Sequence, residues 1–204
     1  MKKLPIGIQT FDKMRSDDYV YVDKTDIAFN IINSYTYVFL SRPRRFGKSL
    51  FLDTLKNIFE GNKDLFKGLY IYNKWDWDTK YPVIKISWSG TLQSEKDIIS
   101  RTRAILQENQ HRLGVSCTDT DYMPNCFAEL IAKTYEKYNQ KVVVLIDEYD
   151  KPILDNLDNL EMAKWMRTYL KGFYSIIKDS DRFLRFAFLT GVSKFTKTSI
   201  FSDL

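Results

Sequence analysis

The sequence predicts an α/β protein with a mainly parallel sheet sandwiched between helices in three layers. Four short segments have the continuous apolar character of strands buried on both faces. Segments with the apolar spacing of helices separate them, and this alternation is typical of parallel sheets. The predicted strands are residues 37–40, 83–88, 142–146 and 185–190.

Helices are predicted wherever apolar residues recur three and four positions apart. Before the first strand, we expect a short helix at 10–14, an extended segment at 19–22 and a helix at 25–33 that Asp23 caps. The remaining predicted helices are residues 49–59, 95–113, 126–138 and 162–177. Because no repeat or low-complexity linker interrupts the pattern, we treat residues 1–204 as one domain, with 1–35 as an extension packed on it.

The segment between the first strand and its helix carries the most specific motif. It reads Ser41-Arg42-Pro43-Arg44-Arg45-Phe46-Gly47-Lys48-Ser49. The phosphate-binding pattern is G-x-x-x-x-G-K-[ST], in which backbone N–H groups and the lysine meet phosphates and the hydroxyl ligates magnesium. Seven of the eight positions are compatible, and Arg42 replaces the first glycine. A strand before the loop and a helix after it favour phosphate binding at the helix N-terminus.

The third predicted strand runs directly into Asp147 and Glu148. In a parallel sheet, ligands lie beyond the carboxyl ends of the strands, so these carboxylates should share an edge with Lys48. One carboxylate can hold magnesium while the other activates water for attack on the terminal phosphate. The alternatives are a surface lysine at a helix start and a solvated acidic turn. Strand, loop, helix and acidic strand end together favour nucleotide binding.

The hydroxyl residues and arginines near this edge can each be interpreted in two ways, as functional or as structural residues. Thr190 and Ser193 could present hydroxyls to the terminal phosphate or the attacking water, or could bond to nearby backbone. Thr190 favours the first reading because it ends a predicted strand. Arg42, Arg44 and Arg45 could surround a triphosphate with positive charge, or could pair with acids and face solvent. Arg44 and Arg45 are the better phosphate candidates because they lie inside the loop.

Composition restricts the remaining classes of function. The net charge of +5 comes from 31 basic and 26 acidic residues that are interspersed, so no long basic run indicates a nucleic-acid groove. The one histidine, His111, makes histidine-based catalysis or a histidine metal cluster an unlikely chemistry for this chain. Cys117 and Cys126 lack zinc-like spacing, and a reduced cytoplasmic setting is expected. No apolar run has the length of a signal peptide core or a membrane span.

Four segments together resemble the AAA-ATPase-like family of bacteria and archaea, a branch of the P-loop ATPases. They occur in the expected order over most of the chain. The segments are Tyr21-Val22-Asp23-Lys24-Thr25, Ser41-Arg42-Pro43-Arg44-Arg45-Phe46-Gly47-Lys48-Ser49, Val144-Leu145-Ile146-Asp147-Glu148-Tyr149-Asp150-Lys151-Pro152 and Leu189-Thr190-Gly191-Val192-Ser193-Lys194-Phe195.

The resemblance implies a P-loop NTPase fold with ATP and magnesium as ligands. It implies the strand order 1-4-3-2, with the strand of Thr190 between the loop strand and the acidic strand. It places Ser49 and Asp147 at the metal and Glu148 as the base, with Lys48 on phosphate and Thr190 as a sensor. Nucleotide-binding residues are expected at Arg44, Arg45, Phe46, Gly47, Lys48, Ser49 and Leu50.

Family members often carry a restriction-endonuclease-like nuclease domain, so a fused or associated nuclease is an expected partner of the complete protein. No such domain is recognisable in this chain, and we assign it no nuclease function. The chain stops at Phe201-Ser202-Asp203-Leu204, directly after the sensor region, so we expect a fragment that is truncated before the helical lid.

Two functions follow from these residues. The first is a magnesium-dependent ATP hydrolase that drives a conformational change. The second is a nucleotide-dependent switch or interaction module with little turnover, since no arginine finger can be assigned; such a group contributes about 10³- to 10⁵-fold in rate. Direct nucleic-acid binding through the basic excess is a weaker third reading. The sequence does not indicate an oligomeric state.

Overall fold

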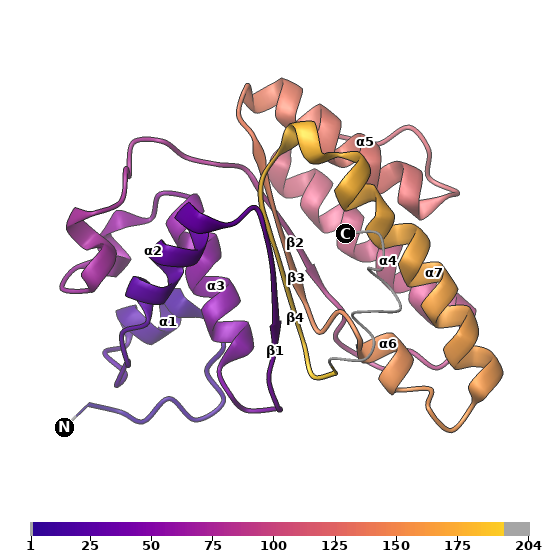
Figure 1. Ribbon diagram of the computed structural model, residues 1–204, viewed down its shortest axis with the longest axis horizontal. Helices are drawn as coiled ribbons and strands as arrows, with labels where there is room; N and C mark the ends of the chain where they lie inside the picture. The colour runs from indigo at the N-terminus through magenta and orange to yellow at the C-terminus, as the bar shows by residue number, and fades with distance from the viewer. Residues whose placement is uncertain (1, 194–204) are drawn as a thin grey trace.

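The computed structural model describes residues 2–193. Lys194, Phe195 and the Phe201 to Leu204 end, which the sequence analysis singled out, lie outside the described residues. Within that range one sheet of four parallel strands has helices on both faces (Figure 1), as predicted. The strands are β1 (Tyr37–Ser41), β2 (Val83–Ser87), β3 (Val142–Asp147) and β4 (Leu184–Gly191).

The sheet has the order β1-β4-β3-β2, which confirms the predicted topology. β4, the last strand in sequence, therefore lies between the strand that leads into the loop and the acidic strand. Its register places Thr190 opposite Leu40 of β1, while Ser87 of β2 pairs with Asp147 of β3. The carboxyl ends of all four strands consequently meet along one edge of the sheet, the lower edge in Figure 1.

Successive side chains along a strand point to opposite faces of the sheet, and each face packs against its own hydrophobic core. In β3, Val142, Val144 and Ile146 face one helix layer, and Val143 and Leu145 face the other. The first layer contains α4 (Glu95–Leu113), α5 (Met123–Tyr138) and α7 (Leu160–Asp179). The second contains α1 (Phe11–Ser16), α2 (Thr25–Ser34) and α3 (Lys48–Phe59). Burial on both faces explains why the strands read as unbroken apolar runs.

Two helices differ most from the predictions. α5 begins at Met123, three residues before the predicted start, because Pro124 is tolerated in a first helical turn. The four-residue helix α6 (Lys151–Leu154) after β3 was not predicted. Residues 19–22 contribute one isolated bridge, Lys3 with Tyr19, and no strand. Within residues 2–193 there are also three 3₁₀ helices: η1 (Lys63–Phe66), η2 (Tyr70–Asn73) and η3 (Asp181–Phe183).

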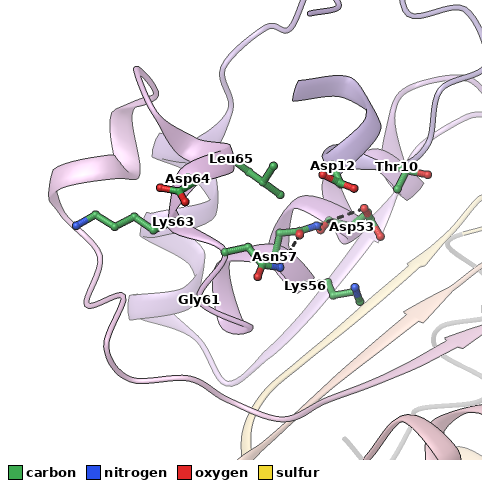
Figure 2. A pocket seen from close by; sticks show the side chains of 10 residues that line it. Thr10, Asp12, Asp53, Lys56, Asn57, Gly61, Lys63, Asp64 and Leu65 are labelled. Carbon is green, nitrogen blue, oxygen red and sulfur yellow. Dashed lines mark hydrogen bonds between the residues drawn. The ribbon is translucent and has the colours of Figure 1, made fainter. Parts of the chain in front are cut away.

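Asp53 of α3 connects the N-terminal segment to the sheet. One oxygen of its buried carboxylate accepts the backbone N–H of Phe11 at 2.8 Å, and the other meets Lys85 Nζ at 3.0 Å. Asn57, one turn further along α3, approaches the same carboxylate at 3.4 Å (Figure 2). α1, α3 and β2 are thus joined by one side chain.

The two cysteines depart from the reduced state that the sequence suggested. Cys117 and Cys126 form a disulfide across the connection between α4 and α5. The two Cα atoms lie 5.1 Å apart. Separately, none of the helices in the described range is long and apolar enough to cross a membrane.

The end of β4 leaves no room for a side chain at Gly191. A Cβ there would lie 2.5 Å from Cε1 of Tyr149 and 2.7 Å from Oδ1 of Asp150. Gly172, inside α7, offers the opposite case, since the nearest atom to its Cβ would be the hydroxyl of Tyr122 at 3.8 Å.

We therefore predict effects of opposite sign for two Gly→Ala substitutions. Gly191→Ala should lower the free energy of unfolding by about 1–3 kcal/mol, because the buried neighbours must shift. Gly172→Ala should raise it by about 0.5–1 kcal/mol, because alanine is the better helix former. Urea unfolding of both variants measures the difference, and a neutral Gly191→Ala would contradict the packing described for β4.

Candidate functional site

Arg42 does not occupy the position of a turn. Its backbone N–H donates to the carbonyl of Gly191 at 3.2 Å, which continues the β1–β4 ladder one residue past β1. An extended residue in a ladder needs no glycine, so the substitution at the first motif position costs the backbone nothing. The turn begins only after it, and the arginine side chain is exposed.

The turn itself depends on two residues with left-handed backbone. Arg45 has φ 68° and Gly47 has φ 74°. A Cβ on Gly47 would meet no atom within 4 Å, so this side of the loop is open to an approaching ligand. Gly47 is the N-cap of α3, and its carbonyl accepts the N–H of Phe51 at 2.9 Å. The loop thus ends on the N-terminus of a 12-residue helix, where free N–H groups and the helix dipole favour anions.

Lys48 lies across this loop. Its side chain is only 8% exposed, and Nζ donates to the carbonyl of Pro43 at 3.0 Å. The ammonium group is therefore held on the inside of the turn, while the side chains of Arg44, Arg45 and Phe46 are exposed. The phosphate-binding roles of Lys48, Arg45 and Phe46 stay predictions.

Asp147 is fixed by the neighbouring strand. Thr190, fully buried on β4, donates its hydroxyl to Oδ1 of Asp147 at 2.5 Å, and the N–H of Glu148 reaches the same oxygen at 3.1 Å. Asp147 is 6% exposed, and it lines one cavity together with Ser49. The arrangement brings together the predicted metal residues and Thr190. In this geometry Thr190 acts on the Asp147 carboxylate, and its contact with phosphate or water stays a prediction.

Glu148 combines an unusual backbone with a shifted pKa. Its φ is 55°, the left-handed region that a non-glycine residue rarely adopts. Burial raises the pKa of its carboxyl, and the charge of Asp147 raises it further. The positive charges of Lys151, Arg44 and Lys48 oppose this rise in the pKa. Glu148 therefore lies within the field of the loop, as its predicted role requires.

Two further residues of the acidic strand end were not recognised as structural from the sequence. Asp150 is 1% exposed and accepts the N–H groups of Val192 at 2.9 Å and Ser193 at 2.5 Å. Tyr149 donates its N–H to the carbonyl of Thr190 at 2.9 Å. Together they join the chain leaving β3 to the chain leaving β4. In the sequence, the only indication of this role was that Asp150 lies three residues after Asp147, close to the end of the same strand.

An apolar hollow of about 180 Å³ lies on the N-terminal side of α3, beside the loop. Its walls include Gly47 and Leu50 together with Pro5, Val20 and Val22 from the N-terminal segment. Val22 is 71% exposed. Leu50 was expected at the nucleotide, and the structure puts it in this hollow. That the N-terminal segment also reaches the loop was not predicted.

The donors available at this edge fit magnesium better than a metal held by protein alone. The described residues contain no group of three or more His, Cys, Asp or Glu that could hold an ion. Magnesium usually keeps several waters and uses one or two carboxylates plus substrate phosphates. The Ser49 hydroxyl and the oriented Asp147 carboxylate match that requirement.

The order of strands, the loop on the N-terminus of α3 and the acidic end of β3 define a P-loop NTPase-like fold. Residues 5–201 match the family model described as "Predicted AAA-ATPase", so the chain belongs to this AAA-ATPase-like family. It is also 52% identical over 205 residues to a protein of Azotobacter chroococcum mcd 1, described as "Uncharacterized protein in vnfD 5'region". The alignment covers all of this chain and 40% of that relative. No solved structure matches.

The shifted pKa of Glu148 predicts a change in stability that does not depend on any reaction. Because the folded pKa is raised, the folded state binds more protons than the unfolded state between pH 4.5 and the raised pKa. The ionised carboxyl therefore destabilises the fold at neutral pH, and Glu148→Gln should be more stable than the wild type there. The advantage should vanish as the pH falls below 4.5.

Urea unfolding across this pH range measures the effect. Glu161→Gln, on the exposed first turn of α7, controls for the loss of one negative charge. If Glu148→Gln had the same stability as the wild type at every pH, the described environment of Glu148 would be wrong.

Proposed function

We propose that the protein binds ATP with magnesium at the carboxyl edge of the sheet, hydrolyses it, and uses turnover to drive a conformational change. The observation that carries the proposal is the convergence of Lys48 and Ser49 with Asp147 and Glu148, with Thr190 bonded to Asp147. Membership of the AAA-ATPase-like family supports nucleotide binding independently.

Phosphate binding would use backbone and side chain together. The N-terminus of α3 offers unpaired N–H groups, and the left-handed residues of the loop turn its backbone toward the same side. Lys48 is already on the inside of the turn and has only to exchange the Pro43 carbonyl for phosphate oxygens. Arg44, whose charge reaches Glu148, adds positive potential from within the loop.

Hydrolysis would divide between the two adjacent carboxylates. Ser49 and Asp147 would hold magnesium, which when bound neutralises charge on the phosphates. Thr190 keeps one oxygen of Asp147 in place, so the carboxylate presents a fixed orientation. Glu148, with its raised pKa, accepts a proton from water more readily than an ordinary glutamate does.

The apolar hollow beside Gly47 and Leu50 would take the nucleobase. It adjoins the end of the loop, and its side chains offer a flat base apolar contact. Val22, which lines the hollow and is exposed, would lose contact with water when a base covers it.

We also propose a cytoplasmic location and a fused or associated nuclease domain for the complete protein. Both rest on the family resemblance, and the Cys117–Cys126 disulfide, which is uncommon in reducing compartments, is an observation against the first. Since the chain corresponds to 40% of the length of its relative, the activity of the whole protein is itself part of this proposal.

Two substitutions separate binding from turnover. Lys48→Ala should weaken ATP binding, because the loop loses its only inward cation among the described residues. Glu148→Gln should keep the affinity and lower kcat by about 10²- to 10⁴-fold, the usual contribution of a general base. Calorimetric ATP titration and phosphate release with and without magnesium provide the two readouts.

The exposed substitutions Lys96→Ala and Glu161→Gln serve as matched controls that should leave both readouts unchanged. Binding without turnover in the wild type would favour the nucleotide-dependent switch. Unchanged ATP affinity in Lys48→Ala would contradict both functions.

A further inference from the structure

A polar cavity of about 460 Å³ extends from Ser49 and Asp147 along the outer edge of β2, and we call it the β2-side cavity. Most of its wall plays no part in the nucleotide proposal. Besides Ser49 and Asp147, the charged lining residues are Asp53, Lys56, Lys85, Arg101, Glu108 and Arg112. The volume suits a small organic ligand, since such pockets typically measure about 300–1,000 Å³.

A second hollow adjoins this cavity and shares Thr10, Asp53 and Lys56 with it (Figure 2). There the buried Asp53 carboxylate already accepts the N–H of Phe11, and Asn57 bonds to the backbone carbonyl of Asp53. The Asp53 carboxylate of that hollow is thus already used to hold the N-terminal segment.

Three of the four cations in the β2-side cavity have a carboxylate partner. Lys85 pairs with Asp53 at 3.0 Å, and Lys56 and Arg112 both pair with Glu60, at 3.0 and 3.3 Å. Arg101 differs. Its contacts are to neutral oxygens, and within residues 2–193 it forms no ion pair. Within the described residues, Arg101 is therefore the cation of this cavity that is not held by a carboxylate, although Glu108 and Asp147 also line the cavity.

The guanidinium of Arg101 is both fixed and incompletely bonded. One terminal nitrogen, Nη2, donates to the carbonyl of Ser87 at 3.0 Å and to the hydroxyl of Ser89 at 2.8 Å. Its Nε is buried, and nothing in the described range accepts a hydrogen bond from it. A buried donor without a partner is costly. Within the described residues the other terminal nitrogen, Nη1, makes no hydrogen bond either, and an arginine with unbonded N–H groups is a preferred receptor for phosphate.

The position of Arg101 ties it to the nucleotide site. Ser87, which holds the guanidinium, is the residue of β2 that pairs with Asp147. Arg101 is therefore anchored one strand away from the proposed metal carboxylate, and the same cavity reaches both. Lys85 and Arg112 line the same cavity, but each already has a carboxylate partner, so Arg101 is the residue that would hold an anionic group there.

We propose that the β2-side cavity binds a second ligand, a small organic phosphate whose phosphate group is held by Arg101. The location beside the terminal phosphate of ATP rests on the proposed function, whereas anion binding at Arg101 does not. The ligand would lie next to the reacting end of the nucleotide while using residues that the phosphate loop leaves free.

A titration with inorganic pyrophosphate, followed by ¹⁵N NMR, reports the two sites separately. The Gly47 amide signals the loop, and the Arg101 Nε–H signals the β2-side cavity. We expect both signals to shift and to saturate. In Arg101→Gln the cavity is followed through the Ser89 amide, and its affinity for pyrophosphate should fall by about 10-fold or more, as expected for losing a charged hydrogen bond. The Gly47 response should remain.

Two variants keep the outcomes distinct. Lys48→Ala should abolish the response of Gly47 and leave that of Arg101, so that failure of the nucleotide proposal and failure of this one look different. Arg103→Gln, on the exposed side of the same helix, should change neither. An Arg101 Nε–H signal that does not saturate in the wild type would overturn the proposal. So would a single-stranded oligonucleotide that shifts this signal at lower concentration than pyrophosphate.

Discussion

The hydrogen bond from Thr190 to Asp147 depends on one topological fact, the insertion of the last strand between the first and the third. Because β4 pairs with β1 on one side and β3 on the other, its carboxyl end touches both the loop and the acidic pair. The same strand end receives Arg42 from the loop and Tyr149 from the acidic turn. At Gly191 the side chains of the acidic turn pack directly against β4, so a side chain has no room there. The spacing between the phosphate loop and the acidic carboxylates is thus set by β4.

Charge is the second constraint at this edge. Asp147 and Glu148 place two carboxylates next to each other, and burial adds to the cost of ionising Glu148. Lys48, Arg44 and Lys151 reduce that cost, and within the described part of the chain none of them forms an ion pair with Glu148, so their charges act on it through the local field. The left-handed backbone of Glu148 and Arg45 adds local strain on both sides of the same edge. Strained, charge-balanced residues facing a loop are the pattern expected of a functional site rather than a stabilising one.

The sequence predicted most of the fold because its signals were local. Unbroken apolar runs marked all four strands, and Ser94, which accepts the N–H of Asp97, fixed the start of α4 where it was expected. The features that the sequence did not predict depend on contacts between segments that are distant in the chain. The disulfide needed the turn between α4 and α5, and the hollow beside Leu50 needed the N-terminal segment to fold back on the loop. Arg42 departs from the motif, and only its ladder bond to Gly191, a contact between distant segments, shows that an extended residue belongs there. Arg101 lay outside every motif, since only the pairing of β2 with β3 brings it near Asp147.

The central claim is that β4 orients the metal carboxylate through Thr190, and the magnesium dependence of nucleotide affinity tests it most directly. Calorimetry should compare ATP binding with and without magnesium in the wild type, in Thr190→Ser and in Thr190→Val. The account predicts that magnesium tightens binding in the wild type and in Thr190→Ser, which keeps the hydroxyl. Thr190→Val, which has nearly the same shape but cannot donate to Asp147, should lose about 10-fold or more of that tightening, the equivalent of one charged hydrogen bond. Equal magnesium dependence in Thr190→Val and the wild type would contradict the claim.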